Sequence, residues 1–216
     1  MTILRCEDSR FPYIAYVPDN CSSNPALLVQ LHGAGERGNG GDALDKVLVH
    51  GFSKTVTDEL LKDCILVMPQ CPTDSFWAAR VESIKVFLDE MIERYHADTK
   101  RIYLCGLSMG GYGTWYTAMA YPDLFAAILP CCGGGMAWNA EVLQMPIWAF
   151  HGVDDGTVAV TESISMANAV RATGGSIKLT LLPGVNHNAW EPAMYEYGAI
   201  EWLLTHKRGE SARIQA

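Results

Sequence analysis

Short apolar runs that alternate with longer, helix-like segments constrain the fold of this chain more than any other feature. Residues 26–31, 65–68 and 147–150 form nearly continuous apolar runs, as expected for strands that are buried on both faces. Between such runs, residues 81–95 carry apolar side chains at helical spacing. Strands that alternate with helices in this way favour an α/β fold, in which helices cover a mostly parallel sheet.

Seven strands and four helices are expected from these patterns. The expected strands are residues 13–17, 26–31, 65–68, 102–105, 126–129, 147–150 and 177–182, and the expected helices are 81–95, 111–121, 161–172 and 193–205. Residues 38–61 show no clear periodicity and yield no prediction. The chain has 216 residues, 49% of them hydrophobic, which suits a single domain over residues 1–216 with a sizeable core.

Charge and cysteine content exclude several classes of protein. The net charge is −8, and Lys and Arg form no cluster larger than an adjacent pair such as Lys207 and Arg208, so we expect no nucleic-acid partner. No apolar run approaches the ~18 residues of a membrane helix, and we expect no membrane insertion. The seven cysteines lack zinc-ligand spacing. We therefore expect reduced thiols in a cytoplasmic protein, with no metal and no other cofactor.

The segment Gly106-Leu107-Ser108-Met109-Gly110 matches the pattern G-x-S-x-G. An apolar strand precedes it and a helix-compatible stretch follows it. A sharp turn between a strand and a helix strains the backbone and projects the serine hydroxyl above the sheet. Ser108 is therefore the candidate nucleophile, and a serine nucleophile needs a base that removes its proton.

Six histidines compete for the role of base. His187 lies in a loop after the last expected strand and before the last expected helix, from which it could reach over the sheet edge to Ser108. The base in turn needs an acid that fixes its tautomer. Asp154 and Asp155 both follow the expected strand 147–150, and their position alone leaves the choice between them open. Either aspartate gives the chain order Ser, Asp, His.

A tetrahedral intermediate also needs backbone donors for its negative charge. The N–H groups of Met109 and Ala34 are the candidates, because each follows an expected strand at a glycine-containing turn. Residues 33–38 also match the dinucleotide-binding pattern G-x-G-x-x-G. We discount that interpretation, because Asn39-Gly40-Gly41 disfavours the required helix and the Ser, Asp and His loops would remain unexplained.

Aromatic and polar side chains near these loops are candidates for binding substrate. We expect Trp77, Trp190 and Gln70 to contribute to the pocket, and Phe76 and Trp138 lie in similar positions. Packing in the core is the alternative role for each aromatic residue.

Three segments together resemble the α/β-hydrolase superfamily, in particular its small phospholipase/carboxylesterase-type and predicted-peptidase esterases. They are residues 31–38, 69–72 and 106–115, and the chain is also similar to feruloyl esterases and dienelactone-hydrolase-like proteins. The resemblance covers nearly the whole chain. It implies a mostly parallel sheet of about eight strands with helices on both faces. The short segment between Leu129 and Ile147 leaves no room for a cap domain, so we expect an open site.

The resemblance also selects the acid and the activity. The family pattern H-G-x-x-D-x-x-V matches at Asp155 and Val158, which favours Asp155 over Asp154, although Ala159 stands where the family often has Pro. It implies that Ser108, His187 and Asp155 hydrolyse carboxylic esters through an acyl-enzyme intermediate. A peptidase or a thioesterase would use the same residues, and a non-catalytic binding protein on the same fold remains an alternative. The oligomeric state and the natural ester stay open at this point.

Overall fold

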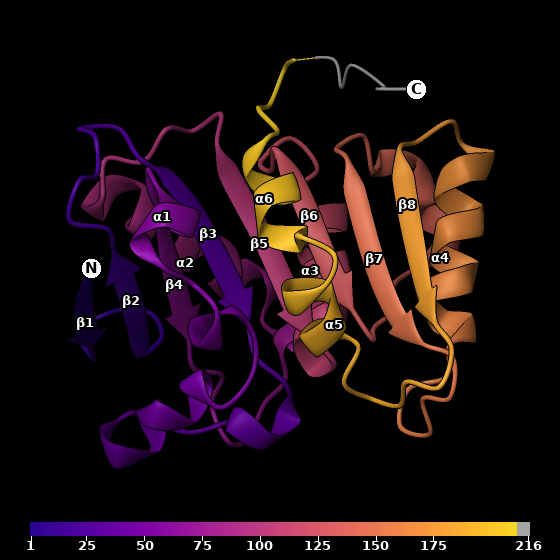
Figure 1. Cartoon of the computed structure of the whole chain (residues 1–216), viewed down its shortest axis with the longest axis horizontal. Helices are drawn as coiled ribbons and strands as arrows, with labels where there is room; N and C mark the ends of the chain where they lie inside the picture. Colours follow the sequence, from indigo (N-terminus) through magenta and orange to yellow (C-terminus); the bar gives the residue numbers. More distant parts are fainter. Residues whose placement is uncertain (211–216) are drawn as a thin grey trace.

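A mixed eight-stranded sheet forms the centre of the computed structural model, which describes residues 1–210 (Figure 1). The strand order is β1-β2-β4-β3-β5-β6-β7-β8. β1 and β2 are antiparallel to their neighbours, and the strands from β4 to β8 in this order pair in parallel. The strands are β1 Thr2–Cys6, β2 Tyr13–Val17, β3 Ala26–Leu31, β4 Cys64–Pro69, β5 Ile102–Leu107, β6 Ala127–Cys131, β7 Ile147–Gly152 and β8 Ile177–Leu182.

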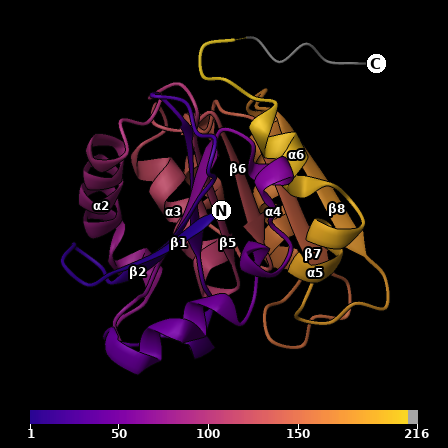
Figure 2. The same ribbon diagram turned by 60° about the vertical axis from the view of Figure 1, so that its left-hand side comes forward.

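Helices cover both faces of this sheet (Figure 2). α2, α3 and α4 pack on one face, whereas α1, α5 and α6 pack on the other. The α-helices are α1 Asp58–Leu61, α2 Val81–Arg94, α3 Met109–Ala120, α4 Thr161–Ala172, α5 Trp190–Tyr195 and α6 Ala199–Leu204. Five 3₁₀ segments complete the described elements: η1 Ala34–Glu36, η2 Gly41–Leu48, η3 Phe52–Lys54, η4 Trp77–Ala79 and η5 Ala137–Val142.

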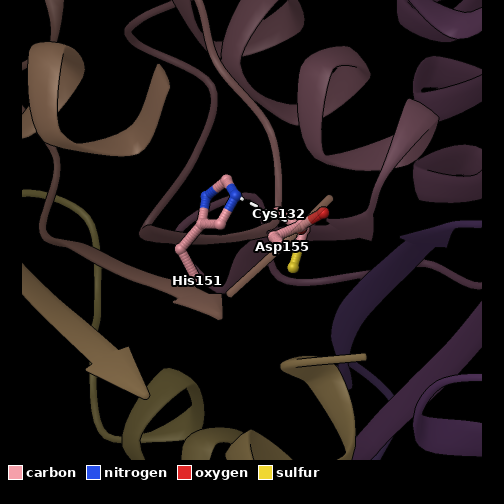
Figure 3. Close-up of side chains that lie close together, drawn as sticks. All are labelled: Cys132, His151 and Asp155. Atoms are coloured by element: carbon pink, nitrogen blue, oxygen red, sulfur yellow. Dashed lines mark ion pairs between the residues drawn. The ribbon is translucent and has the colours of Figure 1, made fainter. Parts of the chain in front are cut away.

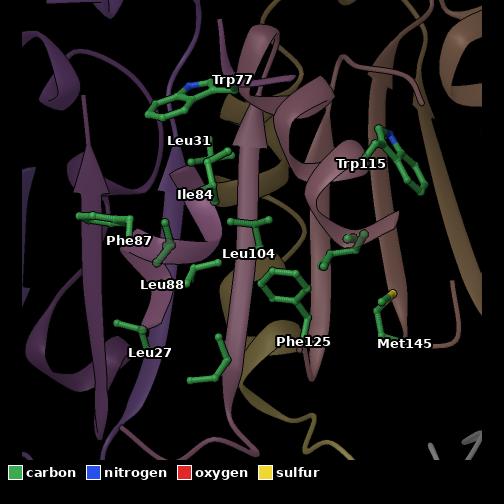
Figure 4. Close-up of a cluster of buried hydrophobic side chains, with 14 of the residues drawn as sticks. Leu27, Leu31, Trp77, Ile84, Phe87, Leu88, Leu104, Trp115, Phe125 and Met145 are labelled. Atoms are coloured by element: carbon green, nitrogen blue, oxygen red, sulfur yellow. The ribbon is translucent and has the colours of Figure 1, made fainter. Parts of the chain in front are cut away.

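Burial on both faces explains the continuous apolar runs. Leu27 on β3 and Leu104 on β5 point to the face covered by α2 and α3, where they join Phe87 and Trp115 (Figure 4). The next residue along β3, Leu28, points to the opposite core. Because successive side chains of a strand point to opposite faces, a strand with helices on both sides needs apolar residues at every position.

The expected elements agree with the structure except near the two ends of the chain. The helix expected over residues 161–172 is α4 with those bounds. β1 was missed because its residues are mostly exposed, so it lacks the apolar signature of the other strands. The single helix expected over residues 193–205 is wrong: α5 and α6 are separated at Gly198, whose φ of 64° interrupts a right-handed helix.

Between β6 and β7 the chain forms only the short η5 segment, so the expected absence of a cap domain holds for this connection. Among residues 1–210, the helices all fall short of the length and apolarity needed to cross a membrane.

The carboxyl ends of β3, β5, β7 and β8 lie along one edge of the sheet, at the bottom in Figure 1. The loops that follow these strands carry the predicted triad and the predicted oxyanion donors. Loops at this edge are where open α/β sheets bind their ligands.

Candidate active site

Ser108 occupies the turn between β5 and α3. Its backbone has φ 55° and ψ −118°, a combination that L-residues rarely adopt and that stores strain. The turn is tight: a Cβ at Gly110 would run into the carbonyl oxygen of Leu31. Glycine at this position therefore lets α3 pack directly against the end of β3. The turn is of the strand-to-helix type that exposes a serine hydroxyl.

His187 lies between β8 and α5 and contacts both other members of the predicted triad. Its Nε2 is 2.7 Å from Ser108 Oγ, and its Nδ1 is 2.7 Å from Asp155 Oδ2. The side-chain oxygen of Asn186 accepts hydrogen bonds from the backbone N–H groups of His187 and Gly156. Asn186 thus ties the loop of the histidine to the loop of the aspartate.

Asp155 follows β7, and its side chain is fully buried. Oδ1 accepts hydrogen bonds from the backbone N–H groups of Thr157 at 2.8 Å and Val158 at 2.9 Å, which leaves Oδ2 for His187. Burial by itself raises the pKa of this carboxyl, but the hydrogen bonds from His187 and the two amides outweigh it and hold the pKa below its ordinary value. Its neighbour Asp154 is exposed. The structure therefore brings Asp155, and not Asp154, to His187.

The two predicted oxyanion donors lie at helix starts. Ala34 is the first residue of η1 and Met109 is the first residue of α3, and N–H groups in a first helical turn have no partner inside the helix. The loop of Ala34 lies against the nucleophile, because a Cβ at Gly33 would be 3.7 Å from Ser108 Cβ. The Ala34 loop thus lies beside the nucleophile, and the role of the two amides as oxyanion donors stays a prediction.

Gln70 and Trp77 do not fit the predicted role in binding substrate, because both side chains are 0% exposed. The amide oxygen of Gln70 accepts a hydrogen bond from Gly40 N, and its amide nitrogen donates to the carbonyls of Glu36 and Ala43. This amide fastens the loop that follows β3 and is therefore not free to contact substrate.

Trp77 supports the same loop through His32. The Trp77 Nε1–H donates to His32 O at 3.0 Å. The His32 ring accepts from Cys71 N at 2.9 Å, and its Nδ1 is 2.6 Å from Gly33 O. Burial is the main reason that the pKa of His32 falls to about 4, so this imidazole is neutral and donates through Nδ1. The backbone on either side of Ala34 is thereby held in place.

Trp190 is nearly buried, and its ring meets the His187 ring edge-on at a centroid distance of 5.4 Å. It packs against the predicted base. Its predicted contact with substrate stays a prediction.

An open groove of about 350 Å³ begins at Met109, directly beside the nucleophile. Phe76, Ala78, Tyr112 and Tyr116 line the rest of it, and Phe76 is 55% exposed. Phe76 was a candidate from the sequence, but the two tyrosines were not. Their spacing of four residues on the helix that follows the nucleophile places both on one face, and this spacing could have indicated them as lining residues.

Cys132, His151 and Asp155 form the only group of three potential metal ligands within residues 1–210. Their sulfur, nitrogen and oxygen atoms lie within 4.8 Å of one another (Figure 3). His151 and the Asp155 side chain are fully buried. The group shares Asp155 with the predicted triad.

Comparisons with known proteins agree with this architecture. Residues 63–200 match the family described as phospholipase/carboxylesterase. A bifunctional acetylxylan esterase/xylanase of Neocallimastix patriciarum is 30% identical over 141 residues, which are 63% of this chain and 20% of that protein. A probable acetylxylan esterase A of Aspergillus flavus is 28% identical over 196 residues, which are 87% of this chain and 64% of that protein.

Solved structures show the same fold. A thermostable esterase has a TM-score of 0.79 and 31% identity, and the match covers 96% of this chain and 63% of that one. An acetyl xylan esterase from Aspergillus awamori, at 17% identity, has a TM-score of 0.72 over 94% of this chain and 99% of that one. This chain spans less than two thirds of the length of both curated relatives and of the thermostable esterase. Because the family match covers more than half of its residues, the chain belongs to the phospholipase/carboxylesterase family of α/β-hydrolases.

Proposed function

We propose that this protein is a serine carboxylesterase that hydrolyses its substrate through an acyl-enzyme intermediate. The continuous hydrogen-bond chain from Ser108 through His187 to Asp155, with both links at 2.7 Å, is the observation that supports it best. Membership of the phospholipase/carboxylesterase family agrees with that activity.

In the first half of the reaction, His187 Nε2 takes the proton of Ser108 as the hydroxyl attacks the acyl carbon. The N–H groups of Ala34 and Met109 stabilise the oxyanion of the tetrahedral intermediate. The protonated His187 then donates its proton to the leaving alcohol. Asp155 keeps the Nδ1–H of His187 in place and stabilises the imidazolium that forms.

In the second half, His187 removes a proton from a water molecule, which attacks the acyl-enzyme carbonyl. The same two amides hold the second oxyanion, and the carboxylic acid leaves as Ser108 regains its proton. These steps use only side chains and amides of the chain itself, and we propose that neither a metal nor another cofactor takes part.

Acetyl esters of sugars are the substrate class that we propose to test first. Several curated relatives are described as acetylxylan esterases. The groove beside Met109 presents the rings of Phe76, Tyr112 and Tyr116, and such surfaces combine an apolar face with hydroxyl groups that can bind polar partners. The open groove is suited to a sugar ring of the alcohol moiety.

Release of p-nitrophenol from p-nitrophenyl acetate tests the mechanism. Ser108→Ala should lose at least ~10⁴-fold in kcat, since the nucleophile is removed. The matched control is Ser176→Ala, which alters an exposed serine just before β8 and should leave kcat unchanged. Equal rates in Ser108→Ala and the natural chain would remove the proposed mechanism and favour a binding protein.

A panel of acetylated xylo-oligosaccharides, hydroxycinnamoyl esters, acyl thioesters and short peptides tests the substrate class. We expect the highest kcat/KM for the acetylated sugars. Higher values for thioesters or peptides would favour the thioesterase or the peptidase, which share the same triad.

We further propose a cytoplasmic protein with a small-molecule substrate and no nucleic-acid partner. All seven cysteines are free, and five of them are buried, which suits a reducing compartment. The net charge of −8 disfavours contact with phosphate backbones. Fractionation of the source cells, with detection by antibody, checks the location.

A further inference from the structure

His151 is a second imidazole at the predicted acid, and the proposed mechanism does not use it. It lies near the end of β7, four residues before Asp155, and is 0% exposed. Its Nε2 is 3.0 Å from Val158 O and 3.3 Å from Asp155 Oδ2 (Figure 3). On the other side of the ring, Nδ1 is 2.7 Å from Ser163 Oγ on α4.

These contacts determine where His151 carries a proton. Val158 O and the ionised Asp155 Oδ2 both accept hydrogen bonds and cannot donate them. The Nε2 atom that faces them must therefore carry a hydrogen, whether the ring is neutral or charged. Ser163 Oγ suits both states, because its single hydrogen can go either to Nδ1 at 2.7 Å or to Gly133 O at 3.0 Å. When the hydroxyl donates to Gly133 O, it accepts from a protonated Nδ1.

Asp155 Oδ2 consequently lies between two imidazoles. His187 Nδ1 is hydrogen-bonded to it at 2.7 Å, whereas His151 Nε2 is hydrogen-bonded to Val158 O and lies 3.3 Å from Oδ2. Oδ1 accepts hydrogen bonds from the backbone amides of Thr157 and Val158. Cys132, at the end of β6, is the third titratable group in this cluster. Burial raises the pKa of its thiol to about 12, so it carries no charge at neutral pH. Of the three titratable side chains next to Asp155, namely Cys132, His151 and His187, only the two histidines can bear a positive charge.

We propose that His151 is a positioning residue, which acts through Asp155 by holding its carboxylate in the orientation that serves His187 and by moderating its basicity. This inference rests on the proposed function. Contacts among Gly133, Ser163 and His151 connect the loop after β6, α4 and β7. From His151 they reach the acid through Val158, whose O is hydrogen-bonded to His151 Nε2 and whose N donates to Asp155, and through the 3.3 Å approach of Nε2 to Asp155 Oδ2. The backbone amides hold Oδ1, and His151 restrains Oδ2.

Two substitutions of the same residue separate this role from packing. In His151→Gln the amide nitrogen takes approximately the place of Nε2, so an N–H group still faces Val158 O and Asp155 Oδ2. In His151→Asn the amide lies near the place of Nδ1, so the contact with Ser163 is kept and the contact with Asp155 is lost. We expect kcat of the Gln variant within about threefold of the natural chain. The Asn variant should lose roughly 10- to 100-fold in kcat, with KM nearly unchanged, because the acid is no longer held in place.

The pH profile supplies a second readout that a packing role would not move. When the N–H group of His151 no longer lies beside Asp155 Oδ2, the carboxylate interacts more strongly with the protonated form of His187. The acid limb of kcat/KM should therefore move to higher pH by up to about one pH unit in His151→Asn, and should stay in place in His151→Gln. The acid limb should move to higher pH whether the natural His151 is neutral or charged.

All variants are compared on p-nitrophenyl acetate, with thermal melts to verify folding and Ser108→Ala in parallel. Natural rates and profile in His151→Asn, or equal losses in the Asn and Gln variants, would overturn the proposal. If neither variant folds, Ser163→Ala decides: a lower kcat with a displaced acid limb supports the role, and an unchanged profile refutes it. Activity that persists in Ser108→Ala would instead refute the proposed function itself, so the two failures are distinguishable.

Discussion

Replacing Asp155 by Asn exchanges one carboxylate oxygen for an amide NH₂ and tests the tautomer on which the mechanism depends. The amide oxygen should stay where Oδ1 accepts from Thr157 N and Val158 N. The NH₂ group then faces His187 Nδ1, which must become an acceptor. Its proton moves to Nε2, 2.7 Å from Ser108 Oγ. A protonated Nε2 cannot take the proton of the serine, so attack fails.

The structure also sets the size of the effect. Turning the Asn amide around would restore an acceptor for His187, but it would leave the N–H groups of Thr157 and Val158 facing an NH₂ group. Thr157 N–H is exposed and can turn to water, whereas Val158 N–H is partly buried. A buried donor left unsatisfied costs about 1–3 kcal/mol, so the productive tautomer becomes less stable by about that amount. At 1.36 kcal/mol per factor of ten, kcat should fall between about 5-fold and roughly 160-fold.

The assay is kcat for p-nitrophenyl acetate at pH 7 and 25 °C, with Asp154→Asn as the matched control. Asp154 is adjacent in sequence and exposed, so its variant should retain the rate of the natural chain. An Asp155→Asn protein with less than a threefold loss would refute the reasoning. A larger loss in the control would transfer the role to Asp154.

Three further predictions concern the frame of the site. Gly110→Ala should destabilise the fold by about 3 kcal/mol, because its Cβ would run into the Leu31 carbonyl; thermal melts measure this against Gly156→Ala, which enters open space. Burial lowers the pKa of His32 to about 4 in the folded protein, whereas the pKa in the unfolded chain is ~6.5. The stability that the neutral His32 contributes is therefore complete above pH ~6.5 and is lost as the pH falls through about 4. Urea titrations should show a loss of roughly 3 kcal/mol over that interval, and a protein whose stability is flat there would contradict the neutral His32. Phe76→Ala should raise KM about fivefold for esters with a ring in the alcohol, through loss of about 1 kcal/mol of ring contact, and should leave KM for ethyl acetate unchanged; equal effects on both esters would argue against the groove.

The central sheet could be predicted from the sequence because strands that are buried on both faces appear as continuous apolar runs. Leu27, Leu28 and Val29 lie alternately in two different cores, so no polar residue interrupts the run. β1 shows no such apolar run, since it is an edge strand with mostly exposed side chains. The break between α5 and α6 depends on a left-handed Gly198, and a single glycine inside an apolar periodic segment does not by itself indicate a break.

The triad was predictable for a different reason. Ser108, Asp155 and His187 lie one, three and five residues after the end of a strand, and parallel strands bring their carboxyl ends to one edge. Substrate contacts follow no such rule. Trp77 and Gln70 also follow a strand, but whether a side chain turns inward depends on tertiary partners such as the His32 and Glu36 carbonyls. Those partners are distant in sequence, and their effect on Trp77 and Gln70 emerges only in the folded chain.

The strain at Ser108 provides a final test of whether function or stability selects this turn. At φ 55° and ψ −118°, a residue with a Cβ costs about 1–3 kcal/mol, whereas glycine adopts such angles freely. Ser108→Ala keeps the Cβ and therefore the strain, while Ser108→Gly removes both. Glycine also loses about 0.5–1 kcal/mol through the greater entropy of its unfolded chain. Ser108→Gly should therefore be more stable than Ser108→Ala by roughly 1 kcal/mol in urea titrations, and both should be inactive. A glycine variant that is less stable than the alanine variant would show that the turn is unstrained; the expected order would mean that the serine is kept for its hydroxyl, against the preference of the backbone.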